Sequence, residues 1–169
     1  MVYEDPQIKN FVSYVSTIFS ETTNSNTGQI YFIKFNSKYI KGMPKDVFNY
    51  YKTHTSNHVD GRIIYLPHKY NNKKCIILYG KDRFKFISND FGSYISSKIE
   101  NGYWEIFPSI INSLIYKFIL GWGLDQYSFK KNKISKFITI PNKLNKFNLI
   151  SILSGIFYGK DLINIPSSD

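Results

Sequence analysis

Two histidines and a carboxylate lie close together in the sequence and have the residue types of a metal site. His54 and His58 stand four positions apart, which on a helix would place both imidazoles on one face, and Asp60 follows them. The chain lacks the glutamate that lies between the histidines of the metalloprotease motif, and Thr55-Ser56-Asn57 is typical of a loop. We therefore interpret both histidines as surface or helix-capping residues.

The single cysteine, Cys75, is a potential nucleophile. Its neighbours Ile76, Ile77 and Leu78 predict a buried position, and burial in apolar surroundings raises the pKa of a thiol and makes it unreactive. One cysteine cannot form a disulfide within the chain, so a reducing cytosol is the expected compartment. We interpret Cys75 as a structural residue.

The pair Gly121 and Gly123 has part of the composition of a phosphate-binding loop. The dinucleotide-binding motif also needs a third glycine and a preceding strand, and this segment has neither. Because glycine is common where helices end, we interpret the pair as the place where a helix stops and the chain turns.

Several aromatic side chains could stack on nucleobases, as in proteins that bind single-stranded nucleic acid. They are Tyr103, Trp104, Trp122 and Tyr127. They fall on the faces of predicted strands and helices, where aromatic residues usually fill the core, so we prefer the core interpretation.

The carboxylates do not form a recognisable ligand set. A two-metal hydrolase needs several carboxylates and a lysine close together, so that a bridging water becomes nucleophilic. The twelve acidic residues are scattered singly, apart from Glu4-Asp5. We assign no catalytic, cofactor-binding or metal-ligating residue, and no cofactor, to this chain.

Hydrophobic periodicity predicts helices and strands that alternate along the chain. The predicted helices cover residues 7–19, 44–51, 90–99, 109–124 and 149–163. The predicted strands cover residues 29–35, 62–66, 74–79, 103–107 and 137–140. The second and third strands should form a hairpin or lie side by side, and Asn89 or Asp90 should cap the third helix. This alternation favours an α/β domain with a mixed sheet flanked by helices.

The composition is that of one packed domain with a basic surface. The chain has 169 residues, of which 43% are hydrophobic, and its net charge is +10. A basic α/β module that binds nucleic acid is therefore one hypothesis. Against it, only Arg62 and Arg83 are arginines, and phosphate recognition favours the forked guanidinium over lysine. A solvated lysine-rich surface is the preferred interpretation.

The sequence predicts a cytoplasmic protein without a membrane partner. The first six residues lack the basic start of a signal peptide. The longest apolar run, residues 110–124, contains Asn112, Ser113 and Lys117 and is too short for a membrane span.

Two segments near the C-terminus carry a resemblance to a known family. Residues 161–169, Asp-Leu-Ile-Asn-Ile-Pro-Ser-Ser-Asp, resemble the Asp-Leu-(Ile/Val)-Asn-x-Pro-x-(Asn/Ser)-Asp segment of the leucyl aminopeptidases, or M17 metallopeptidases. Residues 121–131 are similar to the family's Gly-Trp-x-Leu-Gly-x-Tyr-x-Phe-x-x-Tyr-Lys segment, although Asp125 stands where the family has glycine. Two matches in the right order are a stronger signal than either alone.

The resemblance implies a fold and a role. In this family the matching region is a non-catalytic N-terminal domain, a sheet flanked by helices related to the macro domain. It precedes a catalytic domain that holds two divalent metal ions, manganese or zinc. We therefore expect residues 1–158 to form that N-terminal domain and residues 159–169 to be the linker or start of a catalytic domain.

The resemblance also implies partners. They would be the catalytic domain, other subunits of a homo-oligomer, commonly a hexamer, and the peptides that the whole enzyme hydrolyses. An apolar surface near Ile152, Ile156, Leu162 and Ile163 should then be left uncovered in this chain. A macro-like pocket for a small nucleotide is a further hypothesis.

Overall fold

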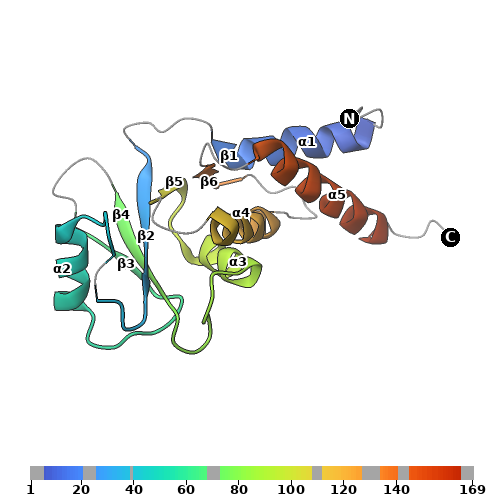
Figure 1. Ribbon diagram of the computed structural model, residues 1–169. Coiled ribbons are helices and arrows are strands. Elements are labelled where there is room, and N and C mark those ends of the chain that lie inside the picture. The colour runs from blue at the N-terminus through green and yellow to red at the C-terminus, as the bar shows by residue number, and fades with distance from the viewer. Residues whose placement is uncertain are drawn as a thin grey trace.

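The chain forms an α/β domain in which one mixed sheet has helices on both faces (Figure 1). The computed structural model describes residues 6–20, 26–38, 40–67, 73–107, 112–126, 134–140 and 145–164. The helices are α1 Pro6–Ile18, α2 Lys45–His54, α3 Asn89–Lys98, α4 Asn112–Gln126 and α5 Lys146–Asn164. The strands are β1 Phe19–Ser20, β2 Gly28–Lys34, β3 Ile63–Tyr65, β4 Lys74–Tyr79, β5 Gly102–Ile106 and β6 Lys136–Thr139.

Every helix and strand predicted from periodicity is confirmed where the structure describes it, with shifts at the ends; residues 109–111, expected to begin the fourth helix, lie outside the described residues. The short strand β1 differs, because Phe19 was expected to close the first helix and instead pairs with Ile138 of β6. The cap of α3 also differs: Ser88 Oγ accepts a hydrogen bond from the backbone N–H of Phe91, so Ser88 is the N-cap rather than Asn89 or Asp90.

The strands of the described residues lie in the order β1-β6-β5-β2-β4-β3. All neighbours are parallel except β3 and β4, which form an antiparallel pair, as expected for the hairpin alternative of the prediction. From the adjacent strands β2 and β5 the chain leaves in opposite directions: β2 leads through α2 and β3 to β4, whereas β5 leads through α4 to β6. In parallel sheets, ligands usually bind at the carboxyl ends of strands beside such a switch point.

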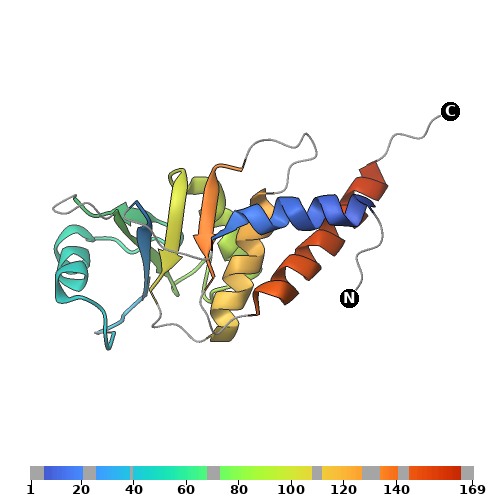
Figure 2. The ribbon, with the colours of Figure 1, turned by 90° about the horizontal axis from the view of Figure 1, so that it is seen from above.

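Each face of the sheet has its own apolar core. One core contains the inward faces of α1, α3, α4 and α5 with the side chains of Phe32, Ile77 and Trp104. The other lies under α2 and contains Ile33, Ile76 and Leu78. In Figure 2, α2 stands alone on one side of the sheet and α1 and α5 extend from the other. The alternation of neighbouring residues between the two cores follows from the two-residue period of a strand.

Helices α3 and α4 approach each other closely enough to exclude side chains at the crossing. A Cβ atom at Gly92 would overlap the backbone carbonyl of Phe118, and one at Gly121 would overlap that of Asn89. A Cβ at Gly123 would overlap the side chain of Leu153 in α5. The prediction that Gly121 and Gly123 end the helix is therefore wrong: α4 continues to Gln126, and the glycines allow neighbouring helices to pack.

The C-terminal helix continues past the predicted domain boundary. The boundary between residues 158 and 159 falls inside α5, which ends at Asn164, and residues 165–169 lie outside the described part of the chain. The start of α1 and the end of α5 lie at the same end of the molecule, far from α2 (Figure 2). Among the described residues, no helix has both the length and the apolar character needed to cross a membrane.

We expect the protein to lose stability at alkaline pH because Tyr31 is buried and other tyrosines are partly buried. Burial, aided by the charges of Asp46 and Glu105, raises the pKa of Tyr31 from 10.0 to about 12. The contribution of neutral Tyr31 to the free energy of unfolding is complete below pH 10. It is lost between pH 10 and 12, because in this range the tyrosine ionises in the unfolded chain but not in the folded protein. Tyr31 alone should cost about 1.4 kcal/mol of unfolding free energy at pH 11.

Urea unfolding at pH 8, 10 and 11 measures this loss, with Tyr31→Phe as the control. The variant should be less stable at pH 8, because the Tyr31 hydroxyl donates to Gln29 Oε1 at 2.7 Å, but its stability should fall less steeply with pH. Burial also raises the pKa of Tyr14 and Tyr79, so some alkaline loss should remain. Equal slopes for the two proteins would contradict the assignment to Tyr31.

Candidate functional site

Two loops meet at the carboxyl ends of β2 and β4, at the lower edge of the sheet in Figure 1. The first leads from β2 to α2, and the second, residues 80–88, leads from β4 to α3. The backbone N–H of Phe35 donates to Tyr79 O at 2.8 Å, and Lys81 Nζ lies 5.2 Å from the centre of the Phe35 ring. The loops are therefore in direct contact and form one surface.

A buried carboxylate fixes the second loop. Asp60 is 7% exposed and accepts hydrogen bonds from the backbone N–H groups of Lys81, Asp82 and Phe84 at 2.7 to 3.1 Å. The Gly80 N–H donates to Phe84 O at 2.8 Å and closes the turn. Gly80 has φ +96° and lies under the aliphatic part of Lys34, where a Cβ would overlap it. Asp60 thus holds residues 80–84 in a single conformation.

His58 is a buried partner of this carboxylate and not a surface residue, so the surface interpretation is wrong for it. His58 Nε2 donates to Tyr79 O at 3.0 Å and lies 3.4 Å from Asp60 Oδ1. Its Nδ1 is 3.2 Å from the Tyr51 hydroxyl, which can donate to it. Both ring nitrogens therefore have partners within the fold, and the geometry is that of a structural histidine.

His54 does not join His58. It closes α2 with Nδ1 3.1 Å from Tyr50 O and its ring stacked on that of Tyr50 at 3.9 Å, and it is exposed. This confirms the helix-end interpretation for His54, and residues 55–57 are non-helical as predicted. No group of three or more His, Cys, Asp or Glu side chains that could hold a metal ion is found among the described residues.

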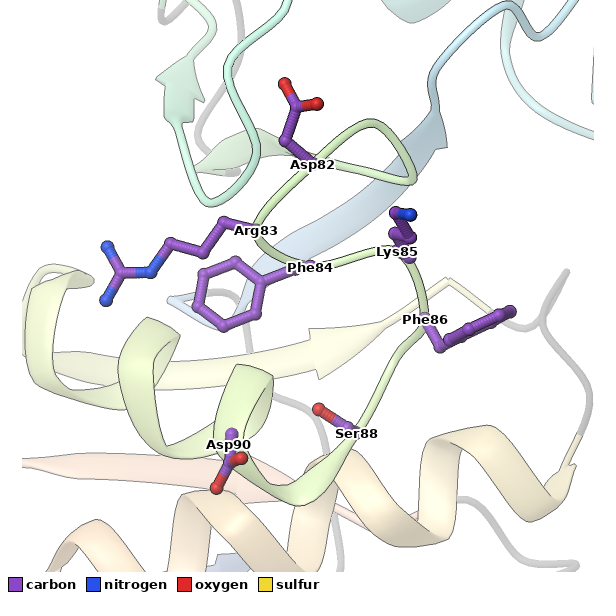
Figure 3. Close-up of a pocket in the computed structure, with 7 residues that line it drawn as sticks. All are labelled: Asp82, Arg83, Phe84, Lys85, Phe86, Ser88 and Asp90. Atoms are coloured by element: carbon purple, nitrogen blue, oxygen red, sulfur yellow. The ribbon is translucent and has the colours of Figure 1, made fainter.

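A hollow of about 310 Å³ opens on the second loop and the start of α3 (Figure 3). It is lined by Asp82, Arg83, Phe84, Lys85, Phe86, Ser88 and Asp90. Figure 3 shows Arg83 and Phe84 directed toward one side of the loop and Phe86 toward the other. Phe84 is buried, and the Arg83 guanidinium carbon lies 4.4 Å from the centre of the Tyr94 ring. Phe86, by contrast, is 72% exposed.

The two contacting loops are rich in basic residues, whereas the charged residues that line the hollow itself are balanced, two acidic and two basic. Residues 34–43 and 80–90 carry six cationic side chains and two carboxylates, Asp82 and Asp90. The cations are Lys34, Lys38, Lys41, Lys81, Arg83 and Lys85. The cations of the two loops can attract an anion by charge, and the Phe86 ring lies beside them on the second loop.

A separate polar cluster lies at the opposite edge of the sheet. Lys136 Nζ donates to Ser96 O, one of the last carbonyls of α3, and Gln126 Nε2 donates to Ser96 Oγ at 2.6 Å. Burial lowers the pKa of Lys136, while the charge of Asp125 opposes the shift. Because Lys136 bonds to an unpaired helix carbonyl, the cluster caps α3.

The remaining candidate residues from the sequence belong to the core where the structure describes them. Cys75 is fully buried, and burial raises the pKa of its thiol, which confirms the structural interpretation. Trp104 and Trp122 are also buried. Tyr103 is 40% exposed and stacks on Phe137 at 4.5 Å, so the core prediction is wrong for it. Tyr127 lies outside the described residues.

Neither the comparison with family models nor that with curated proteins finds a match for this chain. The resemblance to leucyl aminopeptidases therefore rests on the two C-terminal segments.

Sequence reasoning missed the role of Asp60 and the loop that it holds. The available signals were the Asp60-Gly61 pair, typical of a turn, and the alternation of charged and aromatic residues in Lys81-Asp82-Arg83-Phe84-Lys85-Phe86. Neither signal reveals that the two segments touch, because more than twenty residues separate them.

Proposed function

We propose that this chain is the N-terminal, non-catalytic domain of a metal-dependent leucyl aminopeptidase. Its work is to pack on a catalytic domain, to support assembly into an oligomer, and to help shape access to the active site in the cytoplasm. The whole enzyme would release N-terminal amino acids from peptides. The sequence segments at residues 121–131 and 161–169 suggest this proposal.

The observation that carries the proposal is the uncharged outer side of α5. From Phe147 to Gly159 the helix contains no charged residue. Ile152 is 41% exposed, Phe147 is 51% exposed, and a Cβ at Gly155 would meet no atom of the described residues within 4 Å. A solvent-facing helix normally carries charged residues on its outer side, so an uncharged outer side with exposed Phe147 and Ile152 fits a helix that another domain covers.

A second supporting observation is the open part of the sheet. The stacked rings of Tyr103 and Phe137 lie on β5 and β6, on the same face of the sheet as α2. Helix α2 packs on β2, β3 and β4, and so it does not cover these two rings. Parallel strands are usually covered on both faces. The Thr139 hydroxyl on the same strands is buried and has no hydrogen-bond partner among the described residues.

The proposal is tested first by reading the coding sequence beyond Asp169 and then by expressing the complete protein. We expect an open reading frame and hydrolysis of leucine p-nitroanilide that needs manganese and stops with a chelator. In the complete protein, Ile152→Asp should lower activity and oligomer content at least about tenfold, because it places a charge in a buried interface. In the 169-residue chain the same change should alter stability by about 0.5 kcal/mol or less.

Asn49→Asp is the matched control, since it adds the same charge to an exposed position on α2, across the sheet from α5. It should leave activity and assembly unchanged. A stop codon directly after Asp169, or a complete protein without chelator-sensitive hydrolysis, would refute the proposed enzyme. Equal effects of the two substitutions would refute the role of α5.

A further inference from the structure

The carboxyl edge of β2 and β4 combines an exposed aromatic ring with a cluster of cations. Phe86 is the most exposed large apolar side chain among the described residues, at 72%. Lys81 and Lys85 lie on the same loop as Phe86, and Lys34, Lys38 and Lys41 lie at the end of β2 and on the loop that contacts it; we call these five lysines the basic edge. Of these, Lys34, Lys38, Lys41 and Lys85 are exposed.

The exposure of Phe86 is not a consequence of a loose loop. Asp60 holds the backbone of Lys81, Asp82 and Phe84, and the buried Phe84 ring anchors the next turn 4.9 Å from Phe91. At the other end of the loop, Ser88 caps α3. A fixed loop that presents an apolar ring to solvent loses little conformational entropy when it binds, so the site is prepared for a ligand.

We propose that this edge binds single-stranded nucleic acid, with a base stacked on Phe86 at the hollow and phosphates along the basic edge. Proteins that bind single strands combine a positively charged surface with aromatic rings on which bases stack. The hollow of about 310 Å³ beside Phe86 is at the small end of ligand pockets and suits one base. Ser88 and Asp90, which also line it, can accept hydrogen bonds from a base.

The geometry favours a single strand over other polyanions. A membrane surface would need several apolar side chains projecting together, and this edge presents one ring beside a concave hollow. Duplex DNA is usually read by a helix or strand pair lying in a groove, whereas the cations here lie on two loops at the end of a sheet. The lysine-rich composition fits contacts to phosphates that carry no sequence preference. This inference does not depend on the proposed aminopeptidase role.

The test is fluorescence anisotropy of a labelled oligothymidylate of about twelve nucleotides, within the site sizes known for single-strand binding domains. We expect saturable binding whose logarithmic dependence on salt has a slope of about −3, since each lysine–phosphate contact contributes about −0.7. Phe86→Ala should weaken binding roughly tenfold or more without changing that slope, because it removes stacking but no charge. Lys85→Ala should reduce the slope by about 0.7.

Matched controls separate this edge from the general charge of the protein. Phe147→Ala removes a half-exposed phenylalanine on α5, and Lys117→Ala removes an exposed lysine on α4. Both should bind as the parent chain does. Thermal unfolding should show that Phe86→Ala remains folded, since the Phe86 ring is mostly in solvent.

Four results would overturn the proposal. The first two are an absence of saturable oligonucleotide binding at low salt, and equal oligonucleotide affinities of the Phe86→Ala and Phe147→Ala variants. The third is that the protein binds a free mononucleotide as tightly as the strand. The fourth is that it binds anionic lipid vesicles but not the oligonucleotide.

Discussion

Replacing Gly92 with alanine should lower the free energy of unfolding by about 3 kcal/mol or more. The new methyl group would overlap the backbone carbonyl of Phe118, and a backbone cannot move aside as a flexible side chain can. Helices α3 and α4 would have to separate, which would open gaps between the buried Phe91 and Phe118 rings. This cost exceeds the gain of about 1 kcal/mol that alanine brings to a helix interior.

The matched control is Gly155→Ala, in the interior of α5. A Cβ there meets no atom within 4 Å in the part of the chain that the structure describes, so only the helix propensity should act, and the protein should become more stable by about 0.5 to 1 kcal/mol. Urea unfolding followed by circular dichroism measures both variants. Gly121→Ala should behave like Gly92→Ala, since its Cβ would overlap the carbonyl of Asn89. If all three substitutions were stabilising, the close crossing of α3 and α4 would be wrong.

Replacing Asp60 with asparagine should lower the free energy of unfolding by about 2 to 4 kcal/mol. Asparagine has the size of aspartate, but one carboxylate oxygen is replaced by an NH₂ group, which can only donate. The backbone N–H groups of Lys81, Asp82 and Phe84 therefore lose a charged acceptor. His58 would also lose the carboxylate 3.4 Å from its Nε2. Hydrogen exchange at the three amides should become faster, because their partner is weakened.

Asp82→Asn provides the control on the same loop. The Asp82 side chain is exposed, so the same chemical change should alter stability by about 0.5 kcal/mol or less and leave the exchange of the three amides slow. Similar losses in both variants would mean that the loop depends on net charge and not on the buried carboxylate. The comparison therefore separates a local electrostatic effect from the specific hydrogen bonds.

The site shows where sequence-based reasoning stops. Burial of Cys75 could be predicted because its apolar neighbours define a buried strand. The burial of His58 could not, because its partners Tyr51 and Tyr79 come from a helix and a strand on either side of it in sequence. The exposure of Phe86 was equally hidden: Phe84 and Phe86 have the same local pattern, yet one enters the core and the other faces solvent.

The sequence by itself determined the α/β class and the helices and strands of this protein, apart from the short strand β1. These follow from local periodicity, which every short segment carries. Only the tertiary structure decided the order of the strands, the close crossing at Gly92 and Gly121, and the hold of Asp60 on residues 81–84. Such features depend on contacts between segments far apart in the chain, and those contacts form only when the two cores pack on the sheet.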